Sequence, residues 1–492
     1  MSGCRRITFC LMSLAAWQSL LAADYVVTPD PVTRTVTVEL KLEGEARGSE
    51  FRMPAWAPGD YQLFNYGKVV TDLKFLDGDE EVPFKRTADP NVWVADKPSD
   101  SVVYVVKESR GNFTDNLWFG DNEMFISGPG VFGWMTGHVS GEHSVTVKTW
   151  ISGQKLYAPL RVEPMGDETY RATAKNYDVL LDSPLLLSDR ARVASFLVGK
   201  KQHRFIGFGR NVPVDLSTFV QISSKAVEES LKLFGSLPYD DYTFFGHFGG
   251  FPAGLEHASS TRIGLWSSNA SQASGLIFHE FLHAYNVKVI RPKNLGPFDY
   301  SAPAVTGTLW WLEGVTDYYA SLLEMRSGLM TKEQLLADMA NSNNGLLRSP
   351  GRLRVTLDQS SRRVWEVTGS GGFGGVSYYA KGRVVGFLLD LAIRRESGNN
   401  HSLDDVIRTL YAECLNKEGY AEGRIRELVE QFGGKASADL YDLCVMSTEE
   451  LPFGNVLRMA GFSWDGRQIR ELESASDAER AVAQKYPSPV GS

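Results

Sequence analysis

Apolar and polar side chains alternate over residues 32–40, V-T-R-T-V-T-V-E-L, as they do in a half-buried β-strand. A short apolar run over 102–106 and a second alternating stretch over 143–150 fit further strands. Turn residues such as Pro58-Gly59 separate these segments, and no helical period competes strongly with them. We therefore predict an all-β, sandwich-like domain over residues 24–184. One face of its first strand would carry Val32, Val36, Val38 and Leu40.

Helical and mixed patterns begin after this domain. Residues 217–234 carry apolar side chains at helical spacing, and residues 274–288 contain an apolar run of helical length. Between them, residues 242–248 form an aromatic run that is typical of a strand, here expected at a sheet edge. The mixture predicts a second, α+β domain over residues 185–330. Because 492 residues are too many for a single core, two or three domains are expected.

The C-terminal third has a helical pattern. Thr331 and Ser402 each precede, by three residues, a Gln or Asp that can complete a helix-capping pair. These signals predict a helical region over 331–461. The last segment, 462–492, is rich in small and polar residues, and we expect a tail whose end is poorly ordered.

The N-terminus resembles a secretory signal peptide. Arg5 and Arg6 precede an apolar run that ends near Ala23, so we expect a signal over residues 1–23, export to a periplasm or secretion, and no stable membrane anchor. Without this segment the net charge is near −10, which argues against a nucleic-acid partner. Cys414 and Cys444 then remain, and they fit either a disulfide or two separate buried thiols.

The segment Ser274–Lys288 contains H-E-F-L-H, which is a zinc signature. On a helix, His279 and His283 project from one face, so that both imidazoles can bind one Zn²⁺ while Glu280 lies beside the water that the metal activates. The alternative is a pair of buried histidines in an amphipathic helix. A third ligand is therefore needed to support a metal site.

A candidate for that third ligand lies thirty residues after His283, in T-L-W-W-L-E-G-V-T-D-Y-Y. Glu313 and Asp317 are one helical turn apart: the first can complete a His₂Glu zinc site, and the second can accept the free ring N–H of a ligand histidine. The alternative is a solvated acidic face, but the segment is crowded with apolar side chains among which carboxylates need partners.

Two further segments carry weaker signals. Glu256, in G-G-F-P-A-G-L-E-H, follows the predicted edge strand, where it can pair with a substrate ammonium or simply form a local salt bridge. The glycine-rich segment G-S-G-G-F-G-G lacks the spacing of a phosphate-binding loop. We expect it to bend the backbone beside the active site and to deliver Tyr378 or Tyr379.

These residues also carry a resemblance to a known family. The chain is similar to the glycyl aminopeptidases, metallopeptidase family 61, of the gluzincin type with a thermolysin-like catalytic domain. The similarity covers nearly the whole mature chain, in stretches that include M-P-A-W-A-P-G-D-Y, Y-D-V-L-L-D-S-P, A-G-L-E-H, H-E-F-L-H-A-Y-N-V-K-V-I-R-P, L-W-W-L-E-G and S-Y-Y-A-K-G.

The resemblance implies a thermolysin-like fold for 185–330, completed by the helical region. It implies that A-G-L-E-H binds substrate, with Gly254 in the element and Glu256 as the ammonium anchor, and that Tyr379 rather than Tyr378 stabilises the transition state. Members of the family commonly continue into a PDZ domain, whereas about thirty residues follow Gly461 here, so PDZ-dependent properties are not carried over.

The sequence thus predicts a zinc aminopeptidase acting on peptides, with Glu280 as general base and, by resemblance, a preference for small N-terminal residues such as Gly or Ala. Two alternatives stay open. In a zinc endopeptidase Glu256 would be structural and the cleft open at both ends. In an inactive peptide-binding module the zinc site would fail to bind metal.

Overall fold

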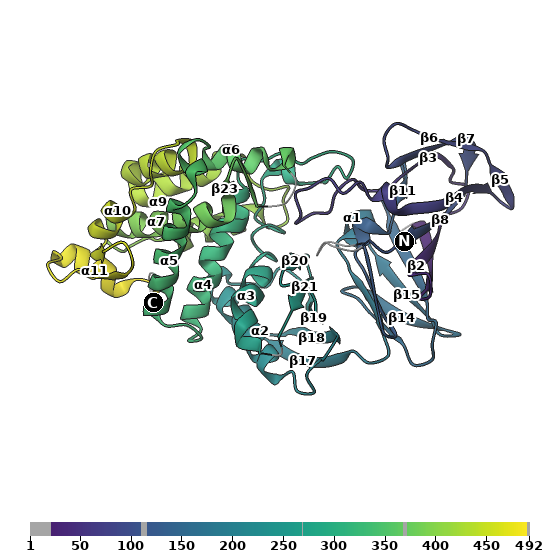
Figure 1. Ribbon diagram of the computed structural model, residues 1–492, viewed down its shortest axis with the longest axis horizontal. Coiled ribbons are helices and arrows are strands. Elements are labelled where there is room, and N and C mark those ends of the chain that lie inside the picture. The colour runs from purple at the N-terminus through teal and green to yellow at the C-terminus, as the bar shows by residue number, and fades with distance from the viewer. Residues whose placement is uncertain (1–20, 110–115, 268, 368–370, 490–492) are drawn as a thin grey trace, which may run out of the picture.

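The computed structural model describes residues 21–109, 116–267, 269–367 and 371–489. Figure 1 shows β-sheets at one end of the molecule, helices at the other and a smaller sheet between them. The predicted signal segment lies outside the described residues except for its last three, which begin strand β1 (Leu21–Asp30). No helix in the described ranges is long and apolar enough to cross a membrane.

The N-terminal domain is built on an eight-stranded sheet. Strand β2 has the alternating burial that the sequence predicts, with Val36, Val38 and Leu40 in the core, but it begins at Thr35, and Val32 lies in the preceding turn with 89% of its surface exposed. In spatial order the sheet contains β14 (Arg161–Gly166), β15 (Thr169–Ala174), β12 (Glu142–Lys148), β1, β2 (Thr35–Leu42), β8 (Ser101–Lys107), β4 (Val70–Asp77) and β5 (Glu80–Val82).

Two four-stranded sheets complete this domain. One contains β11 (Trp134–Met135), β3 (Gly48–Arg52), β7 (Val92–Ser99) and β6 (Phe84–Arg86). The other contains β13 (Lys155–Tyr157), β16 (Leu185–Ser188), β10 (Glu123–Ile126) and β9 (Leu117–Gly120). Helix α1 (Tyr177–Leu181) precedes β16. Because β16 pairs with β10 and β13, residues 185–188 belong to the β domain by their hydrogen bonds.

A five-stranded sheet links the β domain to the helices. Its order is β17 (Arg192–Val198), β18 (Lys201–Gly209), β19 (Asp241–Phe248), β21 (Ser260–Leu265) and β20 (Gly254–Glu256). Phe205 packs toward the helices, whereas Ile206 and Phe208 pack with Phe125 of the β domain. Burial of both faces explains why β19 carries aromatic side chains on both of them, Phe244 toward the helices and Phe245 toward the β domain. The sequence placed this strand at a sheet edge; it lies in the middle, and β20 is the edge.

The helices that carry the predicted zinc motif pack against this sheet. Helix α3 (Ser274–Leu282) ends six residues earlier than predicted, because from His283 onward the backbone forms successive tight turns. The wide π-helical turn η5 (Trp310–Val315) leads directly into α4 (Thr316–Arg326). Gly314 of η5 lies so close to helix α7 (Tyr378–Glu396) that a methyl group there would be 2.5 Å from the Tyr378 carbonyl oxygen.

The remaining helices form the region beyond residue 331, except α2, which precedes the zinc motif. Thr331 and Ser402 both form capping boxes, as predicted, at the starts of α5 and α8. Cys414 and Cys444 are separate buried thiols. The helices are α2 (Ser217–Phe234), which packs on the five-stranded sheet, and α5 (Lys332–Leu347), α6 (Leu357–Arg362), α7 (Tyr378–Glu396), α8 (Leu403–Cys414), α9 (Arg424–Tyr441) and α10 (Phe453–Met459).

The segment predicted to be a tail is folded over residues 462–489. It forms a hairpin of β24 (Phe462–Trp464) and β25 (Ile469–Glu471), then α11 (Asp477–Lys485). Tyr486 is only 1% exposed, and its ring lies against Phe387 of α7. This segment is folded because a few apolar side chains at helical spacing are enough to bind it to the core, whereas the disorder predicted for its end is not tested. Residues 490–492 lie outside the described residues.

Candidate active site

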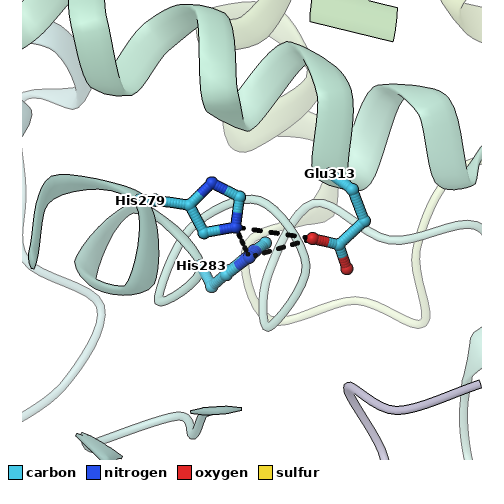
Figure 2. Close-up of side chains that lie close together, drawn as sticks. All are labelled: His279, His283 and Glu313. Carbon is cyan, nitrogen blue, oxygen red and sulfur yellow. Dashed lines mark hydrogen bonds and ion pairs between the residues drawn. The ribbon is translucent and has the colours of Figure 1, made fainter. Parts of the chain in front are cut away.

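The two histidines of the H-E-F-L-H motif converge at the end of α3. Their Nε2 atoms are 2.9 Å apart, and their rings meet edge to face (Figure 2). The four-residue spacing puts both on one side of the helix, as predicted. His279 is 8% exposed and His283 1% exposed, so both are shielded from bulk water.

Glu313 completes the group from the π-helical turn η5. Its Oε2 lies 3.5 Å from His279 Nε2 and 3.2 Å from His283 Nε2, so three ligand atoms of the His₂Glu type face one point (Figure 2). Burial by itself raises the pKa of Glu313, but the two histidines beside it lower this pKa to about 2. The carboxylate is therefore ionised at neutral pH. Two imidazoles and a carboxylate form a donor set that fits Zn²⁺.

Each histidine has a partner on its other ring nitrogen. Asp317 of α4 places Oδ1 2.8 Å from His279 Nδ1, and the backbone carbonyl of Asn286 accepts a hydrogen bond of 2.7 Å from His283 Nδ1. Both contacts keep the proton on Nδ1 and leave Nε2 free to bind metal. Asp317 lies where the sequence predicted. The sequence did not predict the contact with Asn286, because a backbone carbonyl oxygen is present in every residue type.

Glu280 lies next to the histidines and beneath strand β20. It is 4% exposed, and a methyl group at Gly254 would lie 2.0 Å from its Cδ and Oε1 atoms. Burial is the main cause that raises the pKa of Glu280 to about 7; Glu256 and Glu313 also raise it, and the two histidines oppose the rise. A carboxyl with a pKa near neutrality can both accept and return a proton. Gly254 is thus the residue that lets the edge strand pass close to Glu280.

Glu256 ends the edge strand β20 and is 4% exposed. Ligand atoms of Glu256, Glu280 and His283 all lie within 4.8 Å of one another. Within the described ranges, Glu256 Oε1 has no hydrogen-bond partner. This trio is not a second metal site independent of the first, because His283 Nδ1 is bonded to Asn286 and its Nε2 faces Glu313. A buried carboxylate with an unbonded oxygen instead calls for a cationic ligand.

The glycine-rich segment brings two tyrosines to the site at the start of α7. The Tyr379 ring lies alongside the His279 ring, with centroids 6.2 Å apart. Tyr378 is buried, and its hydroxyl accepts a 3.2 Å hydrogen bond from Gly371 N. Tyr378 therefore anchors the glycine-rich segment, and Tyr379 is the one that lies beside the predicted metal ligands. Residues 368–370 of this segment lie outside the described residues.

Asp182, just after helix α1, holds the far end of the Glu256 strand. Its Oδ1 lies 3.2 Å from His257 Nδ1 and accepts a 2.8 Å bond from Lys288 Nζ, and its Oδ2 accepts a 2.7 Å bond from Ala258 N. The β domain is thereby tied both to strand β20 and to the turns after α3. The sequence analysis missed this cluster because its members are 75 and 106 residues from Asp182 along the chain.

Two parts of the chain match models of a known protein family. Residues 24–189 match the Peptidase M61 N-terminal domain, and residues 272–385 match M61 glycyl aminopeptidase. The chain belongs to the M61 glycyl aminopeptidase family. This confirms the resemblance drawn from the sequence motifs. Together with the His₂Glu donor set, it identifies the chain as a zinc metallopeptidase.

Solved structures share the fold. An aminopeptidase N family protein from Idiomarina loihiensis has a TM-score of 0.82 at 23% identity, covering 90% of this chain and 78% of that one. A mutant M1 zinc metallopeptidase from Deinococcus radiodurans, bound to a Tyr-Ser-Ala substrate, has a TM-score of 0.56 at 14% identity, covering 88% and 96%. Native yeast LTA4 hydrolase has a TM-score of 0.52 at 12% identity, covering 90% and 71%. A search of curated proteins finds no match.

Proposed function

We propose that this metallopeptidase is an aminopeptidase that removes small N-terminal residues, Gly or Ala, from peptides. The observation that carries the proposal is Glu256: a buried carboxylate with an unbonded oxygen, a few ångströms from Glu280 and His283. A free α-ammonium is a cation that every peptide with an unmodified N-terminus carries, two bonds from the carbonyl carbon of its first peptide bond. The preference for small residues rests on the description of the family.

The chain's own residues have distinct roles in this reaction. His279, His283 and Glu313 would hold Zn²⁺, which when bound supplies a Lewis acid that activates water and polarises the carbonyl. Glu280 accepts the proton of the attacking water and passes it to the leaving amine. The Tyr379 hydroxyl donates a hydrogen bond to the developing oxyanion. Loss of such a hydrogen bond typically lowers the rate on the order of a hundredfold or more.

Glu256 and its strand orient the substrate. The carboxylate pairs with the free ammonium and so sets which peptide bond reaches the reacting groups. Strand β20 pairs with β21 on one side and is the last strand of its sheet, so its other side can accept an extended peptide as an added strand. Orientation by the ammonium is what converts a general peptidase into an exopeptidase.

Hydrolysis of glycyl- and alanyl-anilides beside their N-acetylated counterparts tests this proposal. Zinc-loaded wild type should cut the free-amine substrates alone, Glu280→Gln should abolish turnover, and Glu256→Ala should fail mainly on free-amine substrates. Equal cleavage of acetylated substrates would show an endopeptidase. Absence of turnover together with absence of zinc binding would favour a peptide-binding module instead.

We also propose that the protein is exported, to a periplasm or out of the cell. The support is the sequence of residues 1–23, with two arginines ahead of an apolar run. N-terminal sequencing of the protein purified from its native host should find a chain that starts close to Asp24, and an intact Met1 on the mature protein would refute the proposal.

A further inference from the structure

A tight turn of the N-terminal domain lies directly on the carboxylate of Glu256. The turn spans Ala57 to Asp60 and is closed by a 3.0 Å hydrogen bond from Asp60 N to Ala57 O. Its central residues are Pro58 and Gly59, and Gly59 has a φ of +96°. Proline followed by a glycine at positive φ is the signature of a type II turn. We call this segment the Gly59 turn.

The contact between the turn and the carboxylate leaves no room for a side chain. A methyl group at Gly59 would lie 2.6 Å from Glu256 Oε2, 2.8 Å from Oε1 and 2.7 Å from Leu255 Cδ1. All three distances are below the 3.4 Å at which ordinary contact begins. Glycine is thus needed at position 59 for two reasons: its backbone conformation and the lack of space beside Glu256.

Contacts with the catalytic part of the chain fix the position of the turn. Ala55 N donates a 2.7 Å hydrogen bond to Tyr300 O, and Trp56 Nε1 donates a 3.0 Å bond to Asp299 O. On the other side of the turn, Tyr61 is 2% exposed and its ring meets Trp365 edge-on at 5.9 Å. The Gly59 turn therefore belongs by sequence to the β domain and by position to the active site.

The turn limits how a ligand can reach Glu256. Both carboxylate oxygens lie beside the turn, and ligand atoms of Glu256, Glu280 and His283 lie within 4.8 Å of one another. A cation that pairs with Glu256 is therefore limited by the turn and held close to the reacting groups. The turn lies so close to Glu256 that it leaves little space for a substrate to extend beyond an ammonium group bound to this carboxylate. The site is accordingly closed on the amine side by the β domain.

We propose that Gly59 is a specificity-determining residue. Its turn fixes the Glu256 carboxylate at the distance from the reacting groups that suits a free α-ammonium, and it blocks substrates that extend past their first residue. The inference rests on the proposed function, in which Glu256 binds that ammonium. The substrate class it selects is peptides whose N-terminus is neither acylated nor extended.

The size of the effect follows from the distances. With alanine at position 59, restoring ordinary contact requires the Glu256 oxygens to move by roughly 0.6–0.8 Å. A misplacement of about 1 Å in a group that positions substrate costs on the order of a hundredfold in rate. We therefore expect Gly59→Ala to lower kcat/KM for alanyl-anilide by about 10- to 100-fold, while the ratio of acetylated to free-amine cleavage rises.

The chain offers a matched control in Gly137. It has a φ of +89°, so alanine there meets a similar backbone strain, but no atom of the described residues lies within 4 Å of the added methyl group. Gly137→Ala should keep the kcat/KM and the substrate ratio of the wild type. A difference between the two variants then reports the contacts of position 59 with Glu256 and Leu255 and not the conformation of the turn.

The experiment compares wild type, Gly59→Ala, Gly137→Ala and Glu256→Ala, all zinc-loaded, on alanyl-anilide and its N-acetylated form. Loss of free-amine activity in Gly59→Ala but not in Gly137→Ala supports the inference. If Gly59→Ala behaves like Gly137→Ala while Glu256→Ala loses free-amine activity, the inference is overturned and the proposed function stands. If Glu256→Ala keeps the preference for free amines, the proposed function itself fails.

A double variant covers the case in which Gly59→Ala is too unstable to assay. Aspartate at position 256 ends one methylene earlier and moves the carboxylate away from the added methyl group. Gly59→Ala/Glu256→Asp should therefore recover part of the Tm that Gly59→Ala loses relative to Gly137→Ala, the rest being the contact with Leu255 Cδ1, which remains. A double variant as unstable as Gly59→Ala would overturn the inference, because the clash with Glu256 would not be the cause.

Discussion

Substituting Asp182 by asparagine should destabilise the protein chiefly by removing the buried ion pair with Lys288. The Lys288 ammonium lies 2.8 Å from Asp182 Oδ1, and the two side chains are 10% and 23% exposed. Burial raises the pKa of Asp182, but Lys288 and His257 more than reverse this, so the pKa lies well below its ordinary value. Asparagine keeps the shape of the side chain and removes the charge.

The expected cost follows from the geometry. At an effective dielectric constant of about 20, charges 2.8 Å apart attract by about 6 kcal/mol before the cost of desolvation. Removing one partner of a buried pair costs about 3–5 kcal/mol, and the partial exposure of Asp182 favours the lower end, about 3 kcal/mol. At about 2–4 °C per kcal/mol, the midpoint of thermal unfolding should fall by about 6–12 °C.

Calorimetry of Asp182→Asn beside Asp439→Asn measures this directly. Asp439 also pairs with a lysine, Lys435, at 2.7 Å, but both side chains are more than half exposed, and such surface pairs contribute about 0.5 kcal/mol or less. Asp439→Asn should therefore shift the midpoint by about 2 °C at most. If the two variants shift the midpoint equally, the buried pair contributes no more than a surface one, and our account of how Lys288 is held is wrong.

Three further predictions concern other contacts. Asp317→Ala should weaken zinc binding by about 10- to 100-fold in a chelator competition, because His279 Nδ1 loses its partner at 2.8 Å; unchanged affinity would refute this. His203, whose ring is held neutral between Lys201 O and the Tyr239 hydroxyl, has its pKa lowered by burial to about 4. The unfolded chain then binds more protons between about pH 4 and 6.5, so stability should fall by about 3 kcal/mol as the pH drops through that window, and His203→Gln should abolish this dependence in urea titrations. Tyr486→Ala should lower the free energy of unfolding by about 3 kcal/mol and free the C-terminal helix, seen as protease cleavage near Lys485.

Local sequence patterns predicted much of the scaffold of the site. The four-residue spacing of His279 and His283, and the carboxylates of Glu313 and Asp317 on the next helix, are regularities of a single element, and the structure brings these four together. The helix over Ser217–Phe234 and the capping boxes follow from local patterns in the same way.

What the sequence could not show depends on contacts between distant segments. The Asn286 carbonyl is a backbone group and has no side-chain signal. Pro58-Gly59 could be identified as a turn, but nothing along the chain places it on Glu256, 197 positions later. The position of β20 at the edge likewise depends on which strands pair. The aromatic side chains of β19 reflect burial on both faces, and such a pattern does not show where a strand lies in its sheet.

The geometry of the His₂Glu site depends on the number of residues in the wide turn at Trp310–Val315. In an α-helix each residue added or removed rotates everything beyond it by about 100°. Glu313 lies inside the widened turn and Asp317 just beyond it, and they reach opposite nitrogens of the same imidazole, that of His279. Loss of one residue from this turn would swing Asp317 away while leaving the composition of the site unchanged. Deletions here should therefore be tolerated less than any single substitution of the apolar residues around it.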